Sequence, residues 1–135
     1  MNDKVMKLKR FNPGNTRTIR KGRPIIRFAK KGQISLSATL VHKIGLSEKD
    51  SIEFIQDEER PKDWYLIKAK SGNGFSLRKY KSTFDSLLTN SSGMVDKFLE
   101  SIDKKGVASV GCLVSTKPTE VEGLKLYAII TSSAS

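Results

Sequence analysis

Lysine and arginine side chains gather in the first 31 residues of this 135-residue chain, where they could bind the phosphates of a polyanion. Residues 1–31 carry eleven Lys or Arg and one acidic residue, a net charge of +10. Residues 32–135 carry fourteen Lys or Arg and thirteen acidic residues, a net charge of +1. Each phosphate that a cationic side chain neutralises releases a condensed counterion. The asymmetry therefore predicts a polyanionic partner, and the alternative is a solubilising tail without a partner.

Side chains that could carry out catalysis are few and scattered. His42 is the only histidine and Cys112 the only cysteine. Cys112 therefore cannot form a disulfide within the chain, and the sequence has no cluster of His and Cys for a metal site. We interpret His42 as a partly exposed surface residue and Cys112, within VASVGCLVS, as a small core residue. The acidic residues of the segment 57–63 are interpreted as a solvated turn: Asp57, Glu58, Glu59 and Asp63. The sequence predicts no enzyme, no metal and no cofactor.

Aromatic residues beside basic ones could stack unpaired bases. Tyr80 lies within RKYK, next to Arg78 and two lysines, an arrangement that fits single-stranded nucleic acid. It equally fits a core or cross-strand pair, and the sequence leaves both roles open for Tyr80. Trp64 and Phe75 are predicted to be core residues.

Composition limits the class of protein. The chain has the length of one ordinary domain, or of two small modules that share one core. No apolar run approaches the roughly 20 residues of a membrane span, and no signal peptide is recognisable. Proline and glycine interrupt the basic segment where an amphipathic membrane helix would need continuity. We therefore expect a cytoplasmic protein that does not bind a membrane.

The chain divides into a basic arm, residues 1–22, and two further parts, residues 23–70 and 74–135. The arm has little periodicity and is expected to be flexible. In residues 23–70, IIRF and QISLS are predicted strands, and Ser37 and Gly45 are predicted caps of a short helix, ATLVHKI. SIEFIQ and WYLIKAK alternate like the two strands of a hairpin.

The second part is predicted to repeat this order loosely, and the two parts could share one core. SGNG is expected to be a linker, FSLRKY a strand, and a helix is expected from about Thr83, weakened at TNSSG and resumed as MVDKFLESI. VASVGCLVS and LKLYAII are predicted to form a second long hairpin. A weak repeat of glycine, strand, helix and hairpin relates Gly32–Ala69 to Gly74–Thr131, with GQISLS echoed by GFSLR.

The stretch KKGQISLSATLVHKIGLSEKDSIEFI resembles the SpoVT/AbrB-type DNA-binding domain, over about residues 23–69. The matching residues are Gly32, Gln33, Ile34, Leu36, Leu40, Ile44, Gly45, Leu46, Lys49, Asp50, Ile52 and Phe54. The resemblance implies a small barrel made by two chains that swap hairpins, with DNA contacts from the first strand, its turn and the helix. Three positions depart from the family pattern. Ser37 replaces a proline, which is tolerable because a serine N-cap also starts a helix. Val41 and His42 replace basic residues and Gln33 replaces an arginine, and these two departures weaken contact with base edges.

These observations together predict an α+β protein with a small swapped-hairpin-like β-barrel and a flexible basic N-terminal arm. We expect a dimeric DNA-binding protein, a transcriptional regulator or a phage or mobile-element accessory factor, in which the barrel partner is a second chain or the second half of the same chain. The expected nucleic-acid-binding residues are Lys7, Lys9, Arg10, Arg17, Arg20, Lys21, Arg23, Arg27, Lys30, Lys31, Gln33 and Lys43. The alternatives are a single-stranded nucleic-acid-binding protein, and a virion-type or antitoxin-like assembly protein whose arm binds a partner.

Overall fold

The computed structural model of the chain describes residues 22–70, 73–79 and 85–135. The predicted arm lies outside these residues except for Gly22, as does Tyr80, so the expectations for them stay predictions. Among the described residues, neither helix has the length and apolar character that crossing a bilayer requires.

The first half of the chain folds in the predicted order. Its elements are β1 (Ile25–Ala29), β2 (Gln33–Leu36), α1 (Ala38–Ile44), β3 (Ser51–Gln56) and β4 (Trp64–Lys68). Gly32 closes the β1–β2 turn with a φ of +103°, a region that favours glycine. Gly45 ends α1 with a φ of 73°, and its N–H donates to the carbonyl of Val41, as the sequence predicts.

The second half contains more strands than the sequence predicts. Its elements are β5 (Phe75–Ser76), β6 (Arg78–Lys79), β7 (Leu87–Asn90), α2 (Ser92–Ser101), β8 (Ser109–Val114), β9 (Thr119–Val121), β10 (Leu124–Ile130) and the short 3-10 helix η1 (Thr131–Ser133). The predicted strand FSLRKY is divided into β5 and β6 at Leu77, which points into the core.

The first part of the predicted helix, from about Thr83 to TNSSG, is wrong where the structure describes it, whereas the resumed part, MVDKFLESI, lies in and just beyond α2. Residues 87–90 form strand β7, in which Leu87 and Thr89 lie opposite Leu36 and Ile34 of β2. All four side chains are buried. Pairing with β2 buries this alternating pattern, and tertiary pairing therefore overrides the weak local helix preference.

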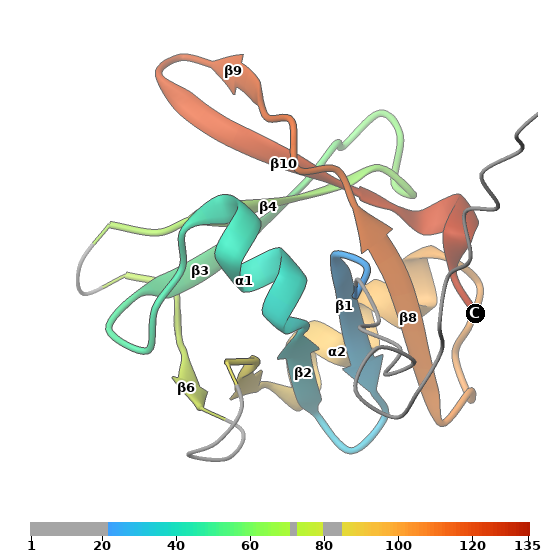
Figure 1. Cartoon of the computed structure of the whole chain (residues 1–135). Coiled ribbons are helices and arrows are strands. Elements are labelled where there is room, and N and C mark those ends of the chain that lie inside the picture. Colours follow the sequence, from blue (N-terminus) through green and yellow to red (C-terminus); the bar gives the residue numbers. More distant parts are fainter. Residues whose placement is uncertain (1–21, 71–72, 80–84) are drawn as a thin grey trace, which may run out of the picture.

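The predicted second long hairpin is also different in the structure. β8 and β10 pair at only two positions, Val114 with Ile129 and Leu113 with Ile130. The connecting segment forms its own strand, β9, which pairs with the first half of β10 and projects from the body of the fold (Figure 1). Glu122 and Gly123 form its turn with φ angles of 50° and 80°, the two positive values of a tight hairpin turn.

The strands form one sheet that curls into a nearly closed barrel (Figure 1). The strand order is β5-β3-β4-β10-β8-β1-β2-β7-β6, and β9 pairs with β10 outside this path. The first and last strands of the order, β5 and β6, are neighbours in the chain, so the sheet returns to its starting point. The fold is α+β, as predicted.

An approximate internal two-fold relates the two halves of the barrel. The pairing β1–β2 corresponds to β6–β7, the pairing β1–β8 to β5–β3, and the pairing β3–β4 to β8–β10. The pairings β2–β7 and β4–β10 each join a strand to its own counterpart in the other half. In each half a serine caps the helix that follows the second strand, Ser37 for α1 and Ser91 for α2. The predicted echo of GQISLS in GFSLR is wrong, because SLLTNS, residues 86–91, leads into α2.

Both halves contribute to one hydrophobic core. Phe28 of β1 stacks on Phe98 of α2, with ring centroids 3.8 Å apart and an interplanar angle of 14°. Trp64 of β4 tilts against the same ring at 5.6 Å, and its indole N–H donates to the hydroxyl of Ser101. Helix α2 contributes an apolar stripe to this core, since Val95, Phe98 and Leu99 are buried there.

Replacing the cap of α1 is expected to destabilise the protein more than replacing the cap of α2. The Ser37 hydroxyl accepts from the N–H groups of Leu40 and Ile25 and donates to the carbonyl of Arg23, whereas the Ser91 hydroxyl accepts from Met94. We expect Ser37→Ala to lower the free energy of unfolding by about 2 kcal/mol and Ser91→Ala by about 1 kcal/mol. Urea unfolding of both variants measures the difference, and equal losses would contradict this account.

Candidate functional site

The predicted nucleic-acid-binding residues that the structure describes lie mostly on β1, its turn and β2. Arg23 precedes β1, Arg27 lies on it, Lys30 and Lys31 form the turn, Gln33 begins β2, and Lys43 lies on α1. All are exposed except Gln33, which is half-buried. The other six lie outside the described residues: Lys7, Lys9, Arg10, Arg17, Arg20 and Lys21.

The point at which the basic arm joins the barrel is fixed by hydrogen bonds. The Ser37 hydroxyl donates to the carbonyl of Arg23 at 2.8 Å and accepts from the N–H of Ile25 at 3.0 Å. The carbonyl of Pro24 accepts from the N–H of Val114 at 2.8 Å. The chain therefore enters the barrel between α1 and β8, directly before the strand that carries Arg27.

Arg27 is held against the surface of β8. Its Nη1 donates to the hydroxyl of Ser109 at 3.4 Å. A Cβ placed on Gly111, its direct cross-strand partner, would lie 2.7 Å from Nη2. The absence of a side chain at Gly111 is what lets the guanidinium lie on this strand.

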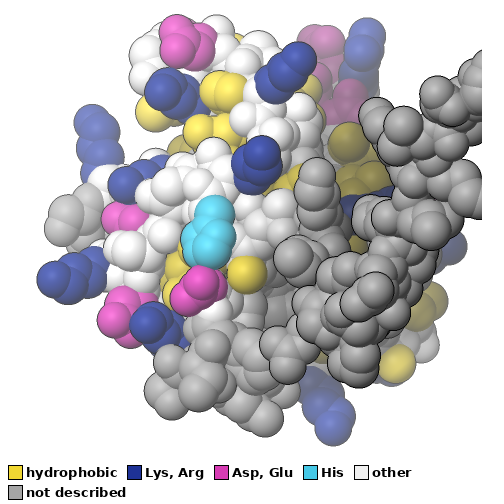
Figure 2. Space-filling model, in the orientation of Figure 1, with side chains coloured by type: hydrophobic (Ala, Val, Ile, Leu, Met, Phe, Trp, Pro, Cys, Tyr) yellow, Lys and Arg dark blue, Asp and Glu magenta, His cyan; other side chains and the backbone are white. Residues whose placement is uncertain are grey.

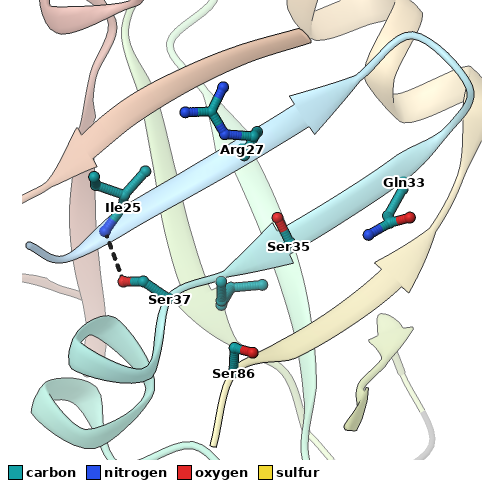
Figure 3. Close-up of a pocket in the computed structure, with 7 residues that line it drawn as sticks. Ile25, Arg27, Gln33, Ser35, Ser37 and Ser86 are labelled. Carbon is teal, nitrogen blue, oxygen red and sulfur yellow. Dashed lines mark hydrogen bonds between the residues drawn. The ribbon is translucent and has the colours of Figure 1, made fainter. Parts of the chain in front are cut away.

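A hollow of about 420 Å³ opens beside Arg27 on the outer face of β1 and β2. It is lined by Ile25, Arg27, Gln33, Ser35, Leu36, Ser37 and Ser86, as Figure 3 shows. A guanidinium, an amide and hydroxyl groups at one hollow can bind the oxygens of a phosphate. The structure thus brings Arg27 and Gln33 together, whereas Lys43 on α1 does not line this hollow.

Arg78 and Asn90 face the same side of the sheet as Arg27, although the sequence did not group them with it. The Nη2 of Arg78 on β6 donates to Oδ1 of Asn90 on β7 at 2.8 Å. The sequence assigned Arg78 to the single-strand hypothesis with Tyr80, and Asn90 to a weak helix. Only the register of β6, β7 and β2 brings them beside Gln33, because Gln33 is the cross-strand partner of Asn90.

The other residues singled out by the sequence have structural surroundings. Trp64 and Phe75 pack in or against the core, as predicted. His42 is exposed on the surface shown in Figure 2, with its Nε2 3.1 Å from a carboxylate oxygen of Asp85. Asp57 accepts from the N–H groups of Glu59 and Arg60, which is the geometry of a polar turn. Within the described ranges, no cluster of three or more His, Cys, Asp or Glu is arranged to hold a metal.

Cys112 is expected to resist thiol reagents in the folded protein. It is buried, and this burial raises the pKa of its thiol from 9.0 to about 11, with the nearby Arg27 acting in the opposite direction. The neutral thiol is therefore favoured in the fold, a contribution to stability that is complete below pH 9 and is lost as the pH rises towards 11. Labelling at pH 8 should be slow in buffer and fast in denaturant; rapid labelling of the native protein would contradict this assignment.

Comparison with known proteins finds no matching family, no matching curated protein and no matching solved structure. The resemblance to the SpoVT/AbrB-type domain therefore stays a prediction that rests on the residues themselves.

Proposed function

We propose that this protein binds double-stranded DNA through its basic arm and its first strand. The observation that carries the proposal is the charge distribution: residues 1–31 have a net charge of +10 and the remaining residues +1. The fixed entry of the chain at Arg23 and Pro24 supports it, since the arm joins the barrel directly before Arg27.

The mechanism is electrostatic docking on phosphates. Arg23, Arg27 and the turn lysines dock from the barrel, while the arm side chains order along the DNA backbone. Contacts to phosphates give affinity and position but carry little sequence information. Gln33 in the hollow and Lys43 on the helix would be the side chains nearest to base edges. We therefore expect high affinity and modest sequence preference. Such binding would suit a transcriptional regulator or a phage or mobile-element accessory factor.

The AbrB-like part of the proposal concerns how the barrel is built. In the SpoVT/AbrB-type domain, two chains exchange hairpins to make one barrel. The internal two-fold of this chain supports an arrangement in which its own two halves take the place of the two chains. A homodimer stays part of the proposal, and it would join through a surface other than the barrel seam, since β2–β7 and β4–β10 already connect the halves. Light scattering of the purified protein, with and without DNA, measures this.

The test is binding of the full chain to a labelled duplex, followed by fluorescence anisotropy over a salt series. We expect the affinity to fall by about 10³-fold or more between roughly 50 mM and 200 mM salt, because several counterions are released. A duplex that does not bind even at the lowest salt would refute the proposal. Preference for a single strand of the same sequence, lost in Tyr80→Ala, would instead favour the single-strand alternative.

The assembly-protein alternative has one structural observation in its favour. The β9–β10 hairpin projects from the barrel and exposes apolar side chains near its tip, Val121 at 46% and Leu124 at 40% of their surface. Exposed apolar residues on a projecting hairpin suit contact with another protein. Stoichiometric co-purification of a protein that is released by Val121→Ser with Leu124→Ser would favour this alternative.

A further inference from the structure

Two arginines, one from each half of the chain, stand at the ends of a single row across the outer face of the sheet. Arg27 of β1 lies opposite Ser35 of β2, Ser35 lies opposite Leu88 of β7, and Leu88 lies opposite Arg78 of β6. Directly opposed residues in a sheet share a face. The core-facing side chains of these strands are their neighbours, such as Phe28, so the row faces away from the core.

The row sets the distance along the sheet between the backbone positions that carry the two arginines. Three inter-strand steps of about 4.8 Å each place the Cα atoms of Arg27 and Arg78 about 14 Å apart along the sheet. Each guanidinium is held by a neighbouring polar side chain, Ser109 for Arg27 and Asn90 for Arg78. Because the two guanidinium groups are already held in place, binding an anion to each of them costs less conformational entropy.

The row of residues next to the one that contains the two arginines is polar. There, Gln33 and Asn90 are direct cross-strand partners, and Ser35 lies on the same face between Gln33 and the hollow described above. Primary amides are the side chains that pair with adenine in a major groove, and hydroxyls bond to phosphate or base. Leu88, also in the central row, is buried, so it is not part of the proposed contact surface; Arg27, Arg78 and Asn90 are exposed, and Gln33 and Ser35 are half-buried.

We propose that Arg27 and Arg78 bind two phosphates on opposite sides of one groove of duplex DNA, with Gln33 and Asn90 facing the groove between them. This inference rests on the proposed function and adds to it a second-half contact, Arg78, and an orientation of the DNA across β1, β2, β7 and β6. The footprint is thus made jointly by both halves of the chain.

A duplex fits this face better than a stacked single strand. Major-groove width in B-DNA is about 12 Å, on the same scale as the separation of the Cα atoms of the two arginines along the sheet. Stacking of unpaired bases needs aromatic side chains on the binding face. Among the described residues, Phe28, Phe98 and Trp64 pack in the core instead, and Tyr80, the stacking candidate, lies outside the described residues.

The test compares charge-neutral variants of the full chain on the same labelled duplex. For Arg27→Gln and Arg78→Gln we expect roughly tenfold weaker binding and a salt slope that is smaller by about 0.9 each, and by about 1.8 in the double variant. The matched control is Arg60→Gln, which makes the same change at an exposed turn residue between β3 and β4. It should leave both quantities at the wild-type values.

A second variant moves Arg27 without changing any charge. Gly111→Ala places a methyl group against the end of the flexible Arg27 side chain, so the fold can accept it while the guanidinium must shift. We expect roughly threefold weaker binding with an unchanged urea midpoint. Arg78→Lys keeps the charge and should restore most of the salt slope.

The outcomes separate this inference from the proposed function. If the wild-type protein binds the duplex but Arg78→Gln behaves like Arg60→Gln, the joint footprint is wrong and binding by the arm and first strand stands. If the wild-type protein does not bind, the proposed function fails and this inference with it. Circular dichroism of each variant identifies a loss of folding, and Arg78→Lys then provides the comparison in a folded protein.

Discussion

Phe98→Ala is expected to lower the free energy of unfolding by about 3–5 kcal/mol, a large share of the stability of a domain of this size. The Phe98 ring is fully buried, stacks on Phe28 and contacts Trp64. It therefore joins an element of the second half to two strands of the first. Its removal leaves a cavity at the place where both halves meet.

Urea unfolding measures this loss with two independent probes. Trp64 is the only tryptophan, and its fluorescence reports on the core directly. Far-UV circular dichroism reports on the whole sheet. Because one core holds both halves, the two transitions should coincide and shift together. Phe75→Ala, at a half-buried ring, should cost less, and two separate transitions in the wild-type protein would contradict a shared core.

If the protein binds DNA as proposed, neutralising the arm is expected to have the largest effect on that binding. A variant with glutamine at six arm positions removes up to six phosphate contacts, so the salt slope should fall by as much as about 5. The positions are Lys7, Lys9, Arg10, Arg17, Arg20 and Lys21. We expect an affinity loss on the order of 10²–10³-fold at moderate salt.

The matched control removes the same number of charges from exposed positions elsewhere. It carries glutamine at Lys70, Lys97, Lys104, Lys105, Lys117 and Lys125, all exposed residues of the two later parts of the chain. This variant has the same net charge as the arm variant, so a non-specific effect of net charge would weaken both equally. Equal weakening, or an unchanged slope in the arm variant, would refute docking by the arm.

Much of the fold could be predicted from local sequence signals. Alternating apolar residues identified β1 to β4, β8 and β10, and Ser37 and Gly45 marked both ends of α1. These signals are local because strand alternation and helix caps depend on residues within a few positions of each other.

The remaining elements depend on contacts that are distant in the sequence. β7 is a strand because β2, more than 50 residues earlier, pairs with it at Ile34–Thr89 and Leu36–Leu87. Arg78 and Asn90 become neighbours of Gln33 only through the same pairing. No short motif records a cross-strand register of this kind, and the candidate site could therefore be predicted on β1 and its turn but not on β6 and β7.

The pairing between the halves also bears on how the chain folds during synthesis. β1, β2 and β4 each need a partner from the second half, β8, β7 and β10, and so they leave the ribosome with one edge open. Open edges of this kind invite pairing with other chains until they are covered. The nascent protein is consequently most exposed to aggregation before β10 emerges, and its folding should be slow for its size because the decisive contacts are non-local.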